Sequence, residues 1–132
     1  SSAASDVYKR QVMPHIVLDR KLDLFDFAIL FKPIFQKSPL IKIHEMYTNV
    51  AGTNSLFSTV VIDSSHRDYF IQIMSSKDRT TIRLFPGTDP EKTDAVKQSL
   101  ANLCLQILDS YPDMKVVKSN LWEYLKIPIV NE

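Results

Sequence analysis

The sequence predicts an α+β domain in which a β-α-β unit occurs twice, forming one mixed sheet of four or more strands with two helices on one face. Three observations predict this fold. Hydrophobic residues make up 45% of the 132 residues, which is enough for a core. Two segments carry apolar residues at helical spacing, and short segments beside them are alternating or continuously apolar. Their order is β-α-β, an insert with an extra strand, and β-α-β again.

The first unit begins with residues 15–18, a short and largely apolar strand. Apolar residues then recur at helical spacing over 24–36, where Pro33 is expected to kink or shorten the helix. Residues 40–47 alternate between apolar and polar side chains, which predicts a half-buried strand. The unit therefore reads strand, helix, strand.

The second unit contains the clearest helix signal. Thr88 to Glu91 has the spacing of a capping box with proline in the first turn, and an apolar stripe follows, which predicts a helix over 89–109. The remaining strands are predicted at 56–62, 69–74, 80–85, 116–117 and 121–125.

Equivalence of the two units would place strands 14–18 and 80–85 parallel to each other in the centre of the sheet. Both helices would then cover one face and leave the other uncovered. Because that second face carries aromatic and β-branched residues, oligomerisation is the expected way to bury it.

Residues 1–12 are predicted to be a leader that does not belong to the fold. Residues 1–5 are small and polar, and 6–11 resemble the translated end of a sequencing adaptor. A natural disordered tail is the alternative. The predicted single domain is 13–132. If it begins at Met13 and the methionine is removed, Pro14 has a free secondary amine.

Composition excludes several classes of site. Two glycines cannot form a Gly-rich phosphate loop, and Cys104, the single cysteine, cannot form an internal disulfide or a multi-cysteine zinc site. The three histidines have no ligand spacing. With 16 basic and 15 acidic residues, the charge does not call for nucleic acid or an anionic membrane as a partner. These features predict a cytoplasmic domain with no cofactor, metal or membrane segment.

A proline that opens a strand, together with a duplicated β-α-β, resembles the tautomerase superfamily. Within it, the start Met-Pro-His-Ile-Val at 13–17 is most similar to 5-carboxymethyl-2-hydroxymuconate isomerase. Residues 39–43 resemble the second strand of that family, and 82–92 resemble its strand, Gly-Arg-Ser turn and helix start. The resemblance covers most of 13–125.

The resemblance implies a cofactor-independent isomerase that moves a proton in a small enolisable mono- or dicarboxylic acid, and a homotrimer. Pro14 would be the catalytic acid/base, with a nearby cation lowering the pKa of its amine. The arginine of the family turn is replaced by Thr88, and a second expected arginine by His44. The candidate carboxylate ligands are therefore Lys42, His44 and Arg83.

Two other functions fit the same residues. One is an inactive, trimeric binding protein that keeps the tautomerase fold and has lost the cationic clamp. The other is a ferredoxin-like ligand-sensing module, whose strand and helix order is β-α-β-β-α-β. In either case Pro14 only rigidifies a strand, while Lys42 and His44 form a solvated face and Arg83 a cross-strand ion pair.

Overall fold

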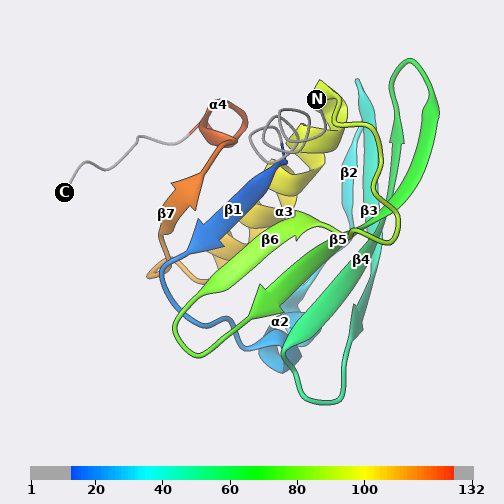
Figure 1. Ribbon diagram of the computed structural model, residues 1–132. Coiled ribbons are helices and arrows are strands. Elements are labelled where there is room, and N and C mark those ends of the chain that lie inside the picture. Colours follow the sequence, from blue (N-terminus) through cyan, green and yellow to red (C-terminus); the bar gives the residue numbers. More distant parts are fainter. Residues whose placement is uncertain (1–12, 127–132) are drawn as a thin grey trace, which may run out of the picture.

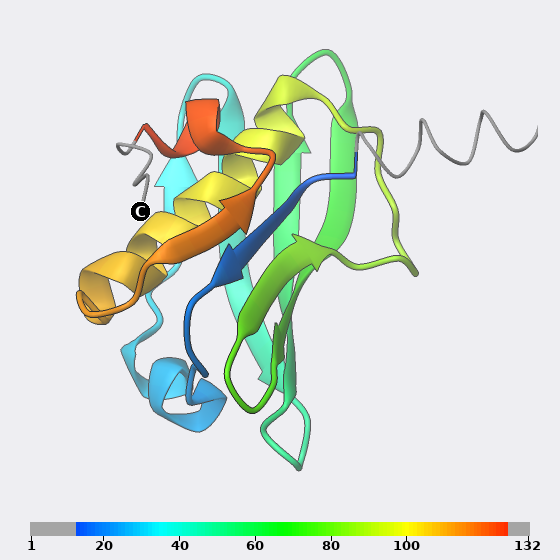
Figure 2. The same ribbon diagram turned by 60° about the vertical axis from the view of Figure 1, so that its left-hand side comes forward.

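The computed structural model describes residues 13–126, so the expected leader, 1–12, and residues 127–132 lie outside it. One seven-stranded sheet runs through the molecule in the order β2-β3-β4-β5-β6-β1-β7. Every pair of neighbouring strands is antiparallel. The sheet curls like part of a barrel around helix α3 (Figures 1 and 2).

The elements, in chain order, are β1 (His15–Leu18), α2 (Leu24–Leu30), β2 (Ile34–Gln36), β3 (Leu40–Thr48), β4 (Asn54–Ile62), β5 (His66–Ser75), β6 (Thr80–Leu84), α3 (Asp94–Ser110), β7 (Val116–Ser119) and α4 (Trp122–Leu125).

The expected duplicated β-α-β and mixed sheet are wrong. Five consecutive strands, β2 to β6, lie between α2 and α3 and follow one another across the sheet. The reason is the length of the connections: turns such as 49–53 and 76–79 are too short for a crossover, so the strands they join must pair antiparallel. Neither the tautomerase fold nor the ferredoxin-like order is formed.

The expected parallel pairing of strands 14–18 and 80–85 is also wrong. β1 and β6 are antiparallel neighbours, with Ile16 opposite Ile82, and they lie toward the β7 edge rather than in the centre. The segment 121–125, expected as a strand, contains the short helix α4.

Both longer helices are shorter than expected, because local hydrogen bonds determine where they start and stop. α2 ends at Leu30, before Pro33, and β2 then pairs with β3 as a separate strand. Helix α3 does not begin at the capping box expected at Thr88–Glu91 but at Asp94. Thr93 is its N-cap and accepts a hydrogen bond from the backbone N–H of Val96 at 3.3 Å.

The core lies between α3 and the inner side of the sheet. Strand residues alternate, so that on β5 every second side chain from Tyr69 to Ser75 is buried. The Tyr69 hydroxyl lies 2.5 Å from that of Ser99 on α3. Helix α2 is on the same side, where the Phe27 ring lies 6.3 Å from that of Phe57 on β4. One face of the sheet is therefore covered.

A polar clamp fastens the β4–β5 turn to the start of α3. The Asp63 carboxylate accepts hydrogen bonds from the Thr93 hydroxyl at 2.8 Å and from the guanidinium of Arg67 at 3.1 Å. The backbone N–H of Ser65 donates a third hydrogen bond to the same carboxylate. Together these contacts lower the pKa of the Asp63 carboxyl from 3.8 to about 2, and the Thr93 hydrogen bond makes the largest contribution. The ionised carboxylate thus orients the cap of α3.

We predict that acid weakens the fold through Asp63. Because the pKa is lower in the folded chain, the stabilising contribution is complete above pH 3.8 and is lost as the pH falls toward about 2. Asp63→Asn removes this contribution, so its urea unfolding midpoint falls less steeply than that of the wild type across this interval. Asp113→Asn, at an exposed carboxyl on the turn after α3, changes the charge by the same amount away from the clamp and serves as the control. Equal slopes for wild type and Asp63→Asn would contradict the clamp.

Candidate functional site

The face of the sheet opposite α3 carries no helix in the described part of the chain (Figure 1). We call it the uncovered face. Its side chains on β3 to β6, and on the residues just after β6, are mostly half-buried, although no other element of the described chain packs over them. They include Tyr47, Leu56, Ser58, Val60, Phe70, Gln72, Arg83 and Phe85. An uncovered face with this many apolar side chains is a candidate binding surface.

A β-bulge on β3 shapes this face. Ile43 pairs with Thr59 and Glu45 with Ser58, so His44 is an extra residue with no partner opposite. The bulge shifts the alternation of β3 by one position. Met46 therefore packs against the core, and Tyr47 projects from the uncovered face.

Three aromatic rings form a row across the face. The ring of Phe70 on β5 lies 6.4 Å from that of Tyr47 and 6.4 Å from that of Phe85, edge-to-face in both cases. The backbone N–H of Phe70 donates to the Thr88 hydroxyl at 3.0 Å, which ties the β6–α3 connection to the row. Phe70 is therefore held in place from both sides.

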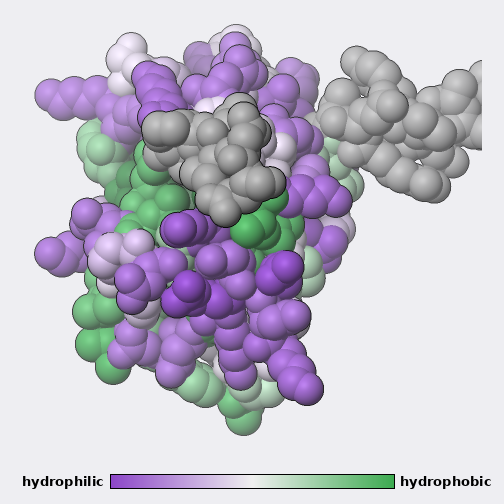
Figure 3. Space-filling view, turned by 90° about the vertical axis from the view of Figure 1, so that its left-hand side faces the viewer, coloured by the Kyte–Doolittle hydropathy of each residue, from purple (hydrophilic) through white to green (hydrophobic). Residues whose placement is uncertain are grey.

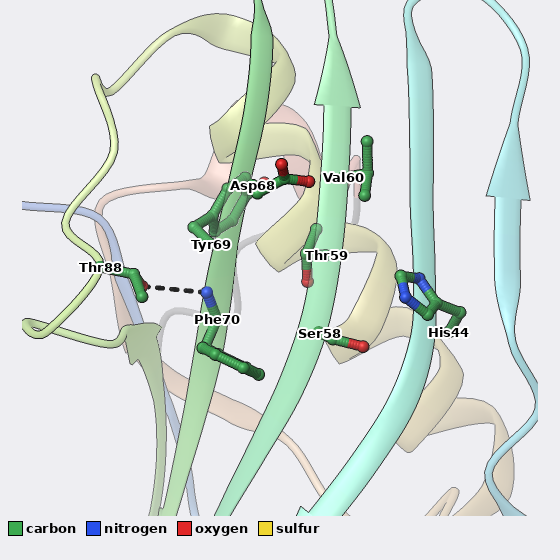
Figure 4. A pocket seen from close by; sticks show the side chains of 8 residues that line it. All are labelled: His44, Ser58, Thr59, Val60, Asp68, Tyr69, Phe70 and Thr88. Atoms are coloured by element: carbon green, nitrogen blue, oxygen red, sulfur yellow. Dashed lines mark hydrogen bonds between the residues drawn. The ribbon is translucent and has the colours of Figure 1, made fainter.

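A hollow lies on each side of this row. The first, which we call the His44 hollow, has a volume of about 270 Å³. It is lined by His44, Ser58, Thr59, Val60, Asp68, Tyr69, Phe70 and Thr88 (Figure 4). The second has about 340 Å³ and is lined by Tyr47, Thr48, Asn49, Asn54, Leu56, Gln72 and Phe85.

Two polar atoms of the His44 hollow are buried and have no hydrogen-bond partner among residues 13–126: Nδ1 of His44 and Oγ of Ser58. They come from adjacent strands, and Figure 4 shows the Ser58 hydroxyl directed toward the strand that carries His44. Other buried hydroxyls of β4 are satisfied, such as Ser55, whose oxygen lies 2.9 Å from that of Thr48. Because an unsatisfied buried group costs ~1–3 kcal/mol, the pair is a feature that a ligand could explain.

Charges of both signs surround the hollow. Lys42 and Asp68 flank Val60 on the neighbouring strands, and Glu45 is opposite Ser58. Asp68 is paired with Nε2 of His66 at 3.2 Å and is largely exposed. The rim therefore has no excess of positive charge.

The structure separates the site residues expected from the sequence. Lys42 and His44 lie together on β3, but Arg83 is on β6, three strands away, which is roughly 14 Å at ~4.8 Å per strand. Its Nε donates to Oε1 of Gln72 at 2.9 Å, so it makes a cross-strand hydrogen bond rather than the expected ion pair. Pro14 is buried at the start of β1, where alternation places it on the helix side with Ile16. The isomerase mechanism stays a prediction.

Sequence reasoning missed Ser58 and Phe70. The alternation of residues 54–62 could have placed Ser58 on the same face as Val60, but the bulge that brings His44 beside it has no signal in the sequence. Cys104 is buried in α3, as expected from its place in the apolar stripe, and burial raises the pKa of its thiol to about 12.

Two other surfaces have fewer features of a ligand-binding site. Around α2 and the β3–β4 turn, Phe25, Ile29 and Val50 are exposed, but no unpartnered buried polar atom is found there. On the β7 side, Lys115 and Lys118 are exposed and the surface is mostly hydrophilic (Figure 3). Lysines at an edge strand oppose pairing with another chain.

Within residues 13–126, no three histidine, cysteine or acidic side chains are placed to hold a metal ion. The helices in this range are all too short or too polar to cross a bilayer. Comparison with protein-family models, curated proteins and solved structures gives no match. The candidate site therefore depends on the geometry of the uncovered face.

We predict that Ser58→Ala changes the free energy of unfolding by less than ~0.5 kcal/mol or raises it, because it removes a polar atom that has no partner. Ser55→Ala is the matched control on the same strand. It leaves the Thr48 hydroxyl unpaired and should cost ~1 kcal/mol. Urea unfolding of both variants makes the comparison. An equal loss in both would mean that Ser58 is already satisfied.

Proposed function

We propose that this protein is a binding module whose His44 hollow holds a small ligand with one apolar ring and one polar end. The observation that carries the proposal is the pair of unpartnered buried atoms, Nδ1 of His44 and Oγ of Ser58, beside the ring of Phe70. Natural structures rarely leave such atoms unpaired, and those that do commonly do so at functional sites.

The size of the hollow supports a compact ligand. Its volume of about 270 Å³ is slightly below the ~300–1,000 Å³ of typical small-molecule sites. The Phe70 ring and the Val60 side chain offer an apolar wall, and the hydroxyl of Ser58 and the imidazole of His44 offer the polar contacts. This combination of apolar walls with a few polar groups is characteristic of ligand sites.

The arrangement favours binding over nucleophilic catalysis. Ser58, His44 and Asp68 are the residue types of a hydrolytic triad and lie on three adjacent strands. However, Ser58 and His44 have no hydrogen bond to each other, and the Asp68 carboxylate is bonded to His66 instead. A serine nucleophile needs a base within hydrogen-bond reach and a third group that orients that base, and neither contact is made here.

We predict that a probe with a single ring binds in the His44 hollow. Benzamide, benzoate and acetophenone share a phenyl ring and differ only in the polar end. In an NMR titration of ¹⁵N-labelled protein, at least one of them should cause saturable shifts of the backbone amides of His44, Ser58 and Phe70. Phe70→Ala should weaken that binding about tenfold, because it removes the apolar wall.

Phe25→Ala is the matched control. Phe25 is exposed on α2, on the opposite side of the sheet, and lines neither of the two hollows, so this variant should bind the probe as the wild type does. The proposal is contradicted if none of the three probes causes saturable shifts, or if the shifts are confined to another surface, such as that of α2.

A further inference from the structure

We infer that the His44 hollow selects a neutral carboxamide as the polar end of its ligand, in preference to a carboxylate or an ammonium group. The inference rests on the proposed function and adds the chemical class of the ligand. It replaces the carboxylate that the sequence alone suggests for Lys42 and His44.

The hydrogen-bonding capacity of the two unpartnered atoms supports this class. The Ser58 hydroxyl can donate and accept, whereas Nδ1 of a neutral imidazole does one or the other, according to the tautomer. If Nδ1 carries the hydrogen, it donates to the amide oxygen, and Ser58 accepts from the amide nitrogen. If it does not, the roles are exchanged. A carboxamide therefore satisfies both atoms with either tautomer of His44.

A charged group does not have this property. A carboxylate only accepts, so it requires the hydrogen on Nδ1. An ammonium only donates, so it requires a bare Nδ1. In either case, the buried position of Nδ1 and Oγ adds the cost of taking a charge out of water.

The rim charges do not offset that cost. Lys42 on β3 would attract a carboxylate, but Glu45 on the same strand and Asp68 on β5 would repel it. His66 pairs with Asp68 at 3.2 Å, and both side chains are more than half exposed, so solvent screens them. Of these charged groups only Asp68 lines the hollow itself, and strand pairing places Lys42 and Glu45 beside its lining residues. With one lysine against two carboxylates, the rim has no excess of positive charge that would attract a carboxylate.

The imidazole also provides a route to the buried atoms. His44 is the extra residue of the bulge, and its ring borders the hollow while Nδ1 is covered. Because both atoms are covered in the structure, we expect a ligand to reach Nδ1 and Ser58 Oγ only after a turn of the His44 ring about its side-chain torsions. The ring of the ligand would then lie against Phe70 and Val60.

The test compares the affinities of the three phenyl probes by NMR titration. Acetophenone replaces the NH₂ of benzamide by a methyl group, and benzoate replaces it by a charged oxygen. We expect benzamide to bind about tenfold more tightly than either, because acetophenone only accepts and so pairs both atoms with just one tautomer of His44, while benzoate also brings a charge into the buried site.

Three variants assign this preference to the two atoms. Ser58→Ala and His44→Leu should each bring the three affinities to within about twofold of one another. His44→Asn offers a donor and an acceptor near the position of Nδ1 and should keep most of the preference for benzamide. This conservative variant separates the hydrogen bond from a mere change of shape.

The results of these titrations distinguish the preference for a carboxamide from the proposed binding function. Tighter binding of benzoate than of benzamide in the wild type would overturn the inference and restore the carboxylate suggested by the sequence. A preference for benzamide that survives both Ser58→Ala and His44→Leu would also overturn it. In both cases the proposed function would stand, because it fails only if no probe binds in the hollow.

Discussion

One-sided burial of the sheet is the constraint on which the rest of this structure depends. Helices α2 and α3 lie on the inner side of the curled antiparallel sheet, and alternate residues of each strand supply the core beneath them. Once Ile71 and Ile73 of β5 face α3, Phe70 and Gln72 must face the other way. The packing of the core thus determines which side chains the uncovered face displays.

The bulge at His44 connects this constraint to the candidate site. Without the extra residue, the alternation of β3 would continue, and Met46 rather than Tyr47 would face outward. The bulge keeps Met46 in the core, adds Tyr47 to the aromatic row and makes His44 a lining residue of the same hollow as Ser58 of the neighbouring strand. A single local irregularity therefore serves both the core and the hollow.

Much of the local structure was predictable, and the topology was not. The strand over 40–47 and the apolar stripe of α3 follow from side-chain periodicity, which depends only on nearby residues. Strand pairing depends on distant contacts. The β-α-β interpretation of the sequence predicted that β1 and β6 are parallel. The turns between β3 and β6 are too short for crossovers, so these strands form an antiparallel meander. β1 then pairs with β6 antiparallel.

The candidate site was predictable only in part, for a similar reason. Lys42 and His44 were identified as neighbours from the alternation of one strand, and they do lie together. Arg83 was grouped with them although it lies three strands away, because distances across a sheet depend on strand order. Ser58 was missed because a serine in a strand has no distinctive pattern. It becomes conspicuous only when its hydroxyl is found buried without a partner.

A crystal structure of the protein with bound benzamide would show whether the His44 hollow holds a carboxamide. We expect the phenyl ring to lie against Phe70, and the amide oxygen and nitrogen each to lie within hydrogen-bond distance of Nδ1 of His44 or Oγ of Ser58. Benzamide bound elsewhere on the surface, or in the hollow with its amide directed away from both atoms, would contradict this expectation.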